Sequence, residues 1–145
     1  MDLSFSEDPP DPESYLALFE TTGWNDMYRR TADELAQAIR RSWLFLGAYR
    51  EGKLVGAGRV VSDGVQYAVI FDMIVAPEQQ GRGIGTAILR HFLRRCESAG
   101  IRDILLFAAE GVAPFYRRHG FVDRPESAPG MILRRKQPSA SRRSC

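Results

Sequence analysis

A glycine-rich stretch, QQGRGIGT at residues 79–86, lies between an apolar run and a segment of helical periodicity. A loop that joins a buried strand to a helix presents unpaired backbone N–H groups and the positive end of the helix dipole, which together suit a phosphate. Glycines allow a phosphate to approach the backbone, and Arg82 adds a charged donor. The stretch therefore predicts a phosphate site, with a plain strand-to-helix turn as the alternative.

Two nucleotide-binding loops can be tested on these residues. A P-loop has a lysine followed by serine or threonine after its last glycine, whereas Gly85 is followed by Thr86 and Ala87. A dinucleotide fingerprint needs a further glycine at position 86 or 88, where the sequence has Thr86 and Ile88. The residues thus fit neither pattern, so the predicted phosphate site is not that of a P-loop or of a dinucleotide fingerprint.

One carboxylate stands out in the apolar run before the loop, where Asp72 interrupts AVIFDMIVA. A carboxylate buried in a central strand is unfavourable unless it is hydrogen-bonded or takes part in the chemistry. Asp72 is therefore either a structural aspartate satisfied by neighbouring N–H groups or a functional residue.

The elements that position these residues follow from periodicity and turn signals. Residues 3–7 alternate as a short strand, and Asp11 with Pro12 begins a helix. Thr31 and Glu34 have capping-box spacing at the start of a second helix. Residues 43–77 then predict a three-strand meander, with turns at residues 51–52 and 63–64 and a third strand from Tyr67 to Val75.

The second half of the chain predicts a crossover. An apolar stripe from Ile84 to Cys96 marks a helix that ends at Gly100, and residues 103–109 form a buried strand parallel to the one before the loop. A short helix follows at residues 113–120. Segments 121–123 (FVD) and 130–133 (GMIL) predict two last strands.

Composition indicates one globular domain, at residues 1–135. The chain has 145 residues, of which 44% are hydrophobic and 26% charged, and the net charge of +2 does not favour nucleic-acid binding. Residues 136–145 are basic, and we expect them to be disordered. The cysteines, Cys96 and Cys145, indicate no disulfide framework, and no apolar run is long enough to span a membrane, so a cytoplasmic protein is expected.

The glycine stretch resembles the acetyl-CoA pyrophosphate loop of the GNAT superfamily of N-acetyltransferases, and Gln80, Gly83 and Gly85 match its pattern. The flanking residues 72–93 resemble the family's fourth strand and third helix, and residues 103–121 resemble its fifth strand and fourth helix. The order of elements is also that of the family. The resemblance implies an α/β (α+β) GNAT fold with a mixed sheet of about seven strands and four helices.

Within the family, the strings SDG, FDMIV, LFA and GM are most similar to small plastid- and cyanobacterial-type arylalkylamine N-acetyltransferases. The resemblance implies acetyl-CoA between splayed fourth and fifth strands, with its pantetheine arm on the backbone of Met73, Ile74 and Val75. The loop residues implied to hold the pyrophosphate are Gln80, Gly81, Arg82, Gly83, Ile84, Gly85 and Thr86.

Two side chains are implied to move protons. Tyr116 matches the family tyrosine that protonates the departing thiolate, although it can also be an ordinary core aromatic. Asp72 is the first candidate for the base that deprotonates the amine, or for an anchor of the cationic amine, and Glu110 is the second candidate for the base. Ala109 departs from the family pattern, since an acid or asparagine is frequent at that position.

Other reactive residues have simpler interpretations. His119 is expected to cap its helix, His91 to face solvent, and Cys96 to be a buried inert thiol. No cluster has metal-ligand spacing, so no metal is expected. The sequence therefore predicts an enzyme that transfers an acetyl group from acetyl-CoA to a primary amine, with a small arylalkylamine or polyamine favoured. A protein acetyltransferase and a non-catalytic acyl-CoA sensor are alternatives, and a homodimer is compatible with the family.

Overall fold

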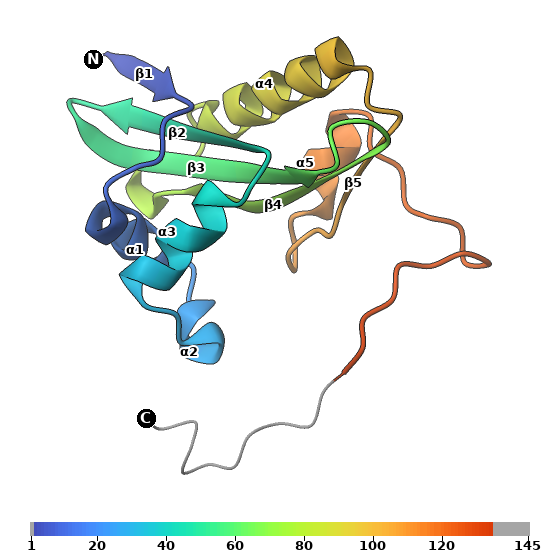
Figure 1. Cartoon of the computed structure of the whole chain (residues 1–145), viewed down its shortest axis with the longest axis horizontal. Helices are drawn as coiled ribbons and strands as arrows, with labels where there is room; N and C mark the ends of the chain where they lie inside the picture. The colour runs from blue at the N-terminus through green and yellow to red at the C-terminus, as the bar shows by residue number, and fades with distance from the viewer. Residues whose placement is uncertain (1, 135–145) are drawn as a thin grey trace. The chain divides into compact units, whose positions relative to one another are not determined.

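A computed structural model of the chain describes residues 2–134 (Figure 1). The chain divides after Phe107 into two compact units. The first unit holds a five-stranded sheet of order β1-β2-β3-β4-β5, antiparallel except for the parallel β4–β5 pair. Its strands are β1 (Leu3–Ser6), β2 (Leu44–Arg50), β3 (Lys53–Ser62), β4 (Tyr67–Val75) and β5 (Asp103–Leu106). Its helices are α1 (Pro12–Glu20), α2 (Asn25–Tyr28), α3 (Ala32–Arg40), the 3-10 turn η1 (Pro77–Gln79) and α4 (Ile84–Ala99).

The helix caps confirm the sequence signals. The Asp11 carboxylate accepts a hydrogen bond from the Ser14 N–H at the start of α1, and Thr31 and Glu34 form the complete capping box of α3. Helix α2 was not predicted, because four residues are too few for an apolar periodicity to be visible. The described residues thus contain five α-helices instead of the four expected.

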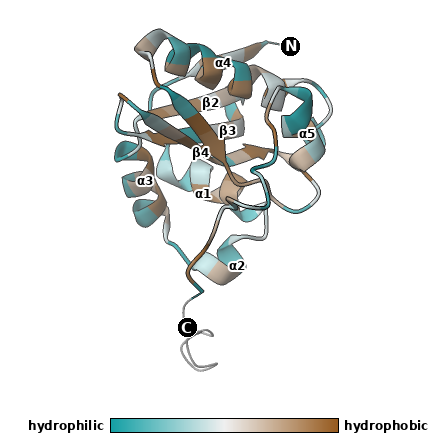
Figure 2. Cartoon of the chain, turned by 90° about the vertical axis from the view of Figure 1, so that its right-hand side faces the viewer, coloured by the Kyte–Doolittle hydropathy of each residue, from teal (hydrophilic) through white to brown (hydrophobic). Residues whose placement is uncertain are grey.

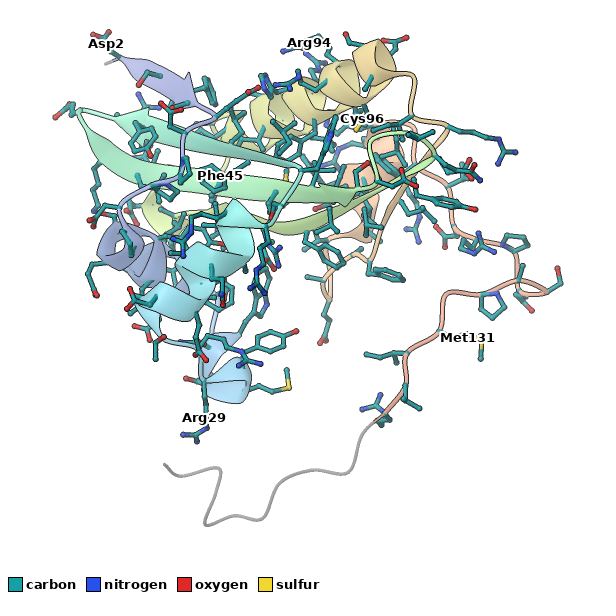
Figure 3. The ribbon with its side chains drawn as sticks, viewed as in Figure 1. Asp2, Arg29, Phe45, Arg94, Cys96 and Met131 are labelled. Carbon is teal, nitrogen blue, oxygen red and sulfur yellow. The ribbon has the colours of Figure 1, made fainter. Side chains whose placement is uncertain are left out.

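Two apolar layers cover the sheet. Helix α4 lies on one face, and α1 and α3 lie on the other (Figure 1). The α4 stripe that contacts the sheet includes Ile88, Phe92 and Cys96, all fully buried. Figure 3 shows Cys96 on the sheet side of α4 and Arg94 on its outer side. In Figure 2 strand β4 is largely hydrophobic, whereas α3 carries both hydrophilic and hydrophobic residues.

The second unit, within residues 108–134, contains helix α5 (Ala113–Arg118). Its end is fixed by His119 as the C-cap and by the bidentate pair between Arg117 and Asp123, with N–O distances of 2.9 and 3.0 Å. The two strands predicted at residues 121–123 and 130–133 were wrong, because neither segment pairs with another strand. Both are short, and Pro125 and Pro129 between them lack the N–H that a strand ladder uses.

Strand β5 is also shorter than the predicted residues 103–109, since it ends at Leu106. The sheet has five strands in the described part of the chain, not the seven expected. The two strands predicted at residues 121–123 and 130–133 are absent. No helix among residues 2–134 is long and apolar enough to cross a membrane. The expected disordered tail at residues 136–145 lies outside the described residues.

Candidate active site

The glycine loop leads into a helix start that has no cap of its own. Gly81 and Gly83 have φ of 78° and 84°, and a Cβ on either residue would meet no atom within 4 Å. Helix α4 begins at Ile84 with neither a side-chain cap nor an acidic residue in its first turn. Because the first N–H groups of a helix have no intrahelical partner, this open turn offers donors and a positive dipole end to an anion.

The Gln80 side chain connects the glycine loop to strand β4 by a hydrogen bond. Its side-chain Nε2 donates to the Val75 carbonyl over 3.0 Å, so the loop folds back onto the end of β4. This bond engages one of the backbone groups that the sequence assigned to the pantetheine arm. The glutamine of the loop pattern therefore has a structural role in setting where the loop lies relative to β4.

Strand β4 continues well beyond its parallel partner. The β4–β5 ladder joins Tyr67–Asp103 through Ile70–Leu106 and ends there, whereas β4 runs on to Val75. Within residues 2–134, no strand pairs with Phe71–Val75 on the β5 side. Backbone groups at such an edge need partners, and an extended ligand can pair with them as an added strand. Met73, Ile74 and Val75 all lie in this open stretch.

A β-bulge interrupts β4 at the same place. Ala57 is opposite Ile74 and Arg59 is opposite Phe71, so Gly58 on β3 faces both Asp72 and Met73. Asp72 has φ of 55°, which is uncommon for a residue with a side chain and is concentrated at functional sites. A bulge changes the direction in which a side chain points. In this bulge the residue with the left-handed backbone is Asp72, the carboxylate that the sequence analysis selected.

Asp72 is held by an arginine. Arg59 Nε lies 2.8 Å from Asp72 Oδ2, and Arg59 Nη1 also donates to Ser42 Oγ at 3.2 Å. The Arg59 guanidinium lies 5.7 Å from the centre of the Phe71 ring. The Asp72 side chain is 24% exposed, so it is half-buried. The partner of Asp72 is thus a guanidinium. From the sequence, a structural Asp72 was expected to have backbone N–H groups as its partners.

A pocket of about 640 Å³ opens at this pair, on the sheet face covered by α1 and α3. Its volume is within the usual range for small-molecule sites. Asp72 and Arg59 line it together with Tyr15 of α1. Burial, and then the charge of Asp72, raise the pKa of Tyr15 well above its usual range, so the phenol stays protonated.

Tyr116 lies on α5 in the second unit and is buried. Its ring centre is 5.0 Å from that of Phe115 and 5.9 Å from that of Phe121, and the Phe121 N–H donates to the Tyr116 carbonyl. Burial raises the pKa of its hydroxyl, which keeps the group protonated at neutral pH. Glu110, the second candidate base, is exposed in the turn before α5.

The remaining reactive residues have structural positions. Cys96 is buried and burial raises its thiol pKa, as expected of an inert cysteine. His119 is the C-cap of α5. His91 was expected to face solvent, but its Nε2 lies 2.6 Å from Glu7 Oε2, and Glu7 also contacts Arg95. These contacts join α4 to the segment between β1 and α1.

Sequence reasoning did not identify Arg59 and Tyr15, which line the pocket together with Asp72. Arg59 interrupts the apolar strand GAGRVV just as Asp72 interrupts its own strand, and two opposite charges in adjacent buried strands are a signal that could have paired them. Tyr15 gave no such signal. It belongs to the apolar face of α1, and only the tertiary structure shows that it reaches the pocket.

Comparisons with known proteins identify the family of the chain. The family model described as Acetyltransferase (GNAT) family matches residues 7–121. A histone acetyltransferase of Glycine max is 32% identical over 80% of this chain and 54% of its own length. A chloroplastic serotonin N-acetyltransferase of Oryza sativa subsp. japonica is 34% identical over 75% of this chain and 56% of its own length. The chain thus spans little more than half of these two relatives.

A solved structure shows the same fold. The crystal structure of a probable acetyltransferase from Staphylococcus aureus superposes with a TM-score of 0.81, at 24% identity, over 92% of this chain and 100% of that one. The family match covers most of the chain and includes β4, the glycine loop and the start of α4. This chain belongs to the acetyltransferase (GNAT) family.

Proposed function

We propose that the protein is an N-acetyltransferase that uses acetyl-CoA and a primary amine. The observation that carries the proposal is the continuity of the open β4 edge, Phe71–Val75, with a glycine loop and an uncapped helix start. The open strand edge can pair with an extended arm, and the loop with the helix start can hold a phosphate at the end of that arm. GNAT enzymes use acetyl-CoA, which has that form and supplies an activated acetyl thioester.

The residues of the chain fit such a ligand. Gly81 and Gly83 leave open space where side chains would otherwise stand, and Arg82 is exposed beside them. The N–H groups at residues 81–86 are proposed to hold the pyrophosphate, and the backbone of residues 73–75 is proposed to hold the arm. The Met73 N–H is proposed to stabilise the oxyanion that forms when the amine attacks.

The proposed chemistry needs two proton transfers. The amine nitrogen forms a bond to the acetyl carbon, the carbon–sulfur bond breaks, and the thiolate takes a proton. Tyr116 is proposed as the donor of that proton, because its hydroxyl is protonated at neutral pH. Asp72 is proposed to anchor the cationic amine and to accept its proton, directly or through water. Its position in the pocket favours it over Glu110, which is exposed in a turn.

A small amine is the favoured acceptor. The pocket beside Asp72 has the volume of a small-molecule site. One relative is named for serotonin and another for histones, so the names of relatives leave both a small amine and a protein lysine open. A non-catalytic acyl-CoA sensor would need the loop and the open strand edge but neither Asp72 nor Tyr116.

The test is release of free CoA thiol from acetyl-CoA, followed with a thiol reagent, across arylalkylamines, polyamines, amino acids and lysine peptides. Turnover of an arylalkylamine above the rate of hydrolysis without acceptor is the expected result. Calorimetric binding of acetyl-CoA without release on any acceptor would instead support the sensor. Absence of both binding and turnover would contradict the proposed function.

A further inference from the structure

Tyr15 is a buried tyrosine whose hydroxyl makes no hydrogen bond to another residue among residues 2–134. Because no fully buried side-chain oxygen of these residues lacks a partner, the hydroxyl must keep access to the pocket that Tyr15 lines. Its side chain is only 2% exposed, and its ring packs 6.0 Å from the ring of Phe19 and 6.2 Å from that of Phe45, centre to centre. A buried tyrosine usually finds a partner for its polar end, because an unpaired buried hydroxyl is unfavourable. Tyr15 lines the pocket, so a ligand there is the natural partner.

The Asp72 carboxylate in the same pocket also has an unused acceptor. Arg59 engages Oδ2, and no donor within the described part of the chain reaches Oδ1. The charge of Asp72 is close enough to Tyr15 to raise the pKa of the phenol further after burial has raised it. A protonated amine has three N–H donors, so it can use the free carboxylate oxygen and the phenol oxygen together.

The charges around the pocket are unequal. Its lining contains three arginines, Arg30, Arg41 and Arg59, against two acids, Glu34 and Asp72, which leaves a net +1 (3 − 2). Arg59 is paired with Asp72, and Arg30 lies 3.6 Å from Glu34. Arg41 has no ion-pair partner among the residues that the structure describes. A ligand with several positive charges would therefore meet repulsion beyond its first ammonium.

The rest of the pocket wall is apolar and partly aromatic. The side chains that form it come from α1, α3, β3 and β4, and are Phe19, Leu35, Ile39, Val61 and Phe71. Phe71 is 36% exposed at the pocket, next to the bulge. Such a wall buries the apolar body of a ligand, and aromatic rings favour a flat one.

We propose that Tyr15 is an acceptor-binding residue, and that its hydroxyl and the free oxygen of Asp72 bind one amine at the end of this pocket. The pocket then selects an amine with a single positive charge on a flat apolar body, and discriminates against polyamines and basic peptides. This inference rests on the proposed function, because it takes the bound amine to be the acetyl acceptor. Binding of the amine can nevertheless be measured without turnover.

The first experiment compares wild type with Tyr15→Phe by calorimetry, using phenethylamine and spermidine as probes, and then by CoA release. We expect wild type to bind phenethylamine more tightly than spermidine. Loss of one hydrogen bond should weaken phenethylamine binding, and raise its KM, by about 3- to 10-fold. The KM for acetyl-CoA should not change. The thermal midpoint of Tyr15→Phe should change little, because the hydroxyl makes no hydrogen bond to the described residues and the ring packing is kept.

Tyr49→Phe is the matched control, since Tyr49 is a half-buried tyrosine of β2 outside the pocket lining. Equal phenethylamine binding by wild type, Tyr15→Phe and Tyr49→Phe would overturn the assignment of Tyr15. Tighter binding of spermidine than of phenethylamine would overturn the selection rule. Amine binding that depends on Tyr15 but is accompanied by no CoA release would support the pocket and contradict the proposed function.

Discussion

Arg59 on β3 holds Asp72 at the bulge of β4, with Arg59 Nε 2.8 Å from Asp72 Oδ2. The contact fixes a carboxylate whose backbone is in the left-handed region, φ 55°, and leaves Oδ1 without a donor in the described residues. Because both side chains are only partly buried, the pair itself adds little stability. Its main effect is to hold the Asp72 carboxylate at the pocket that this residue lines.

Asp72→Asn should lower kcat/KM for an amine acceptor by about 100-fold or more, because an amide neither anchors an ammonium nor accepts its proton. Steady-state rates measured between about pH 6 and about pH 9 would test this, since the loss should persist where the amine itself is mostly protonated. Asp33→Asn, on the exposed side of α3, is the control. If Asp72→Asn had the same rates as wild type across that pH range, Asp72 would have no role in binding or deprotonating the amine.

The glycine loop allows a comparison between two glycines of similar φ. Gly83 has φ of 84° and Gly23 has φ of 79°, and neither would place a Cβ within 4 Å of another atom. Gly83→Ala and Gly23→Ala should therefore each lower the free energy of unfolding by about 1 kcal/mol through backbone strain. Only Gly83→Ala should raise the KM for acetyl-CoA, by about tenfold, because it disturbs the proposed phosphate donors. Urea unfolding and initial rates separate the two effects, and an equal KM in both variants would argue against the loop.

Tyr116→Phe should lower kcat by about 100-fold with little change in the KM for acetyl-CoA, because it removes a proton donor and keeps the ring packing. Burial raises the pKa of Tyr116, so the wild-type donor should remain protonated and kcat should not fall as the pH rises from about 8 to about 10. Tyr67→Phe, at an exposed position on β4, is the matched control. An unchanged kcat in Tyr116→Phe would exclude it as the acid.

The strand, loop and helix around the site were predictable because their signals are local. The hairpin turn at Glu51 and Gly52, the capping box of α3 and the stop at Gly100 each depend on a few adjacent residues. Strand β4 was predicted with its observed bounds, since eight apolar residues interrupted by one acid leave few alternatives. Periodicity therefore placed Asp72 inside a strand and the glycine loop between that strand and a helix.

The pocket and the strand count were not predictable in the same way. The contact between Arg59 and Asp72 depends on the pairing of two strands and on a one-residue bulge, and single-sequence periodicity does not show a bulge. Tyr15 reaches the pocket only because α1 packs on the sheet. Residues 121–123 and 130–133 have strand-like composition, but a strand also requires a partner with which to pair.

Gly58→Ala should disturb the bulge from the opposite strand. A Cβ at this position would lie 2.7 Å from Met73 Sδ and 2.8 Å from Phe92 Cε2, so the neighbouring side chains or the strands must move. We expect a loss of about 1–3 kcal/mol in the free energy of unfolding, as for other overpacked cores, together with a lower kcat. Gly52→Ala, with φ of 77° but open space around it, is the control for backbone effects. If Gly58→Ala proved as stable and active as wild type, the bulge would not depend on this close contact.

Glu7 should make a small, pH-dependent contribution to the attachment of α4. The hydrogen bond from Arg95, and then the contact with His91, lower its pKa below the ordinary 4.5, while partial burial opposes the shift. A lowered pKa means that the stabilisation is present above pH 4.5 and is lost as the pH falls through the folded-state pKa. Since Glu7 is 39% exposed, Glu7→Gln should lower the free energy of unfolding by only about 0.5 kcal/mol near neutral pH.

Urea unfolding of wild type, Glu7→Gln and the exposed control Glu97→Gln, at about pH 7 and about pH 3.5, would measure this contribution. The gap between wild type and Glu7→Gln should narrow at the lower pH, because the contact with Arg95 loses its ion-pair character as the pH falls toward the lowered pKa of Glu7. Glu97→Gln should show no such gap at either pH, since Glu97 faces solvent on α4. A gap that stayed constant from neutral to acidic pH would assign the effect to packing of the Glu7 side chain instead of to its charge.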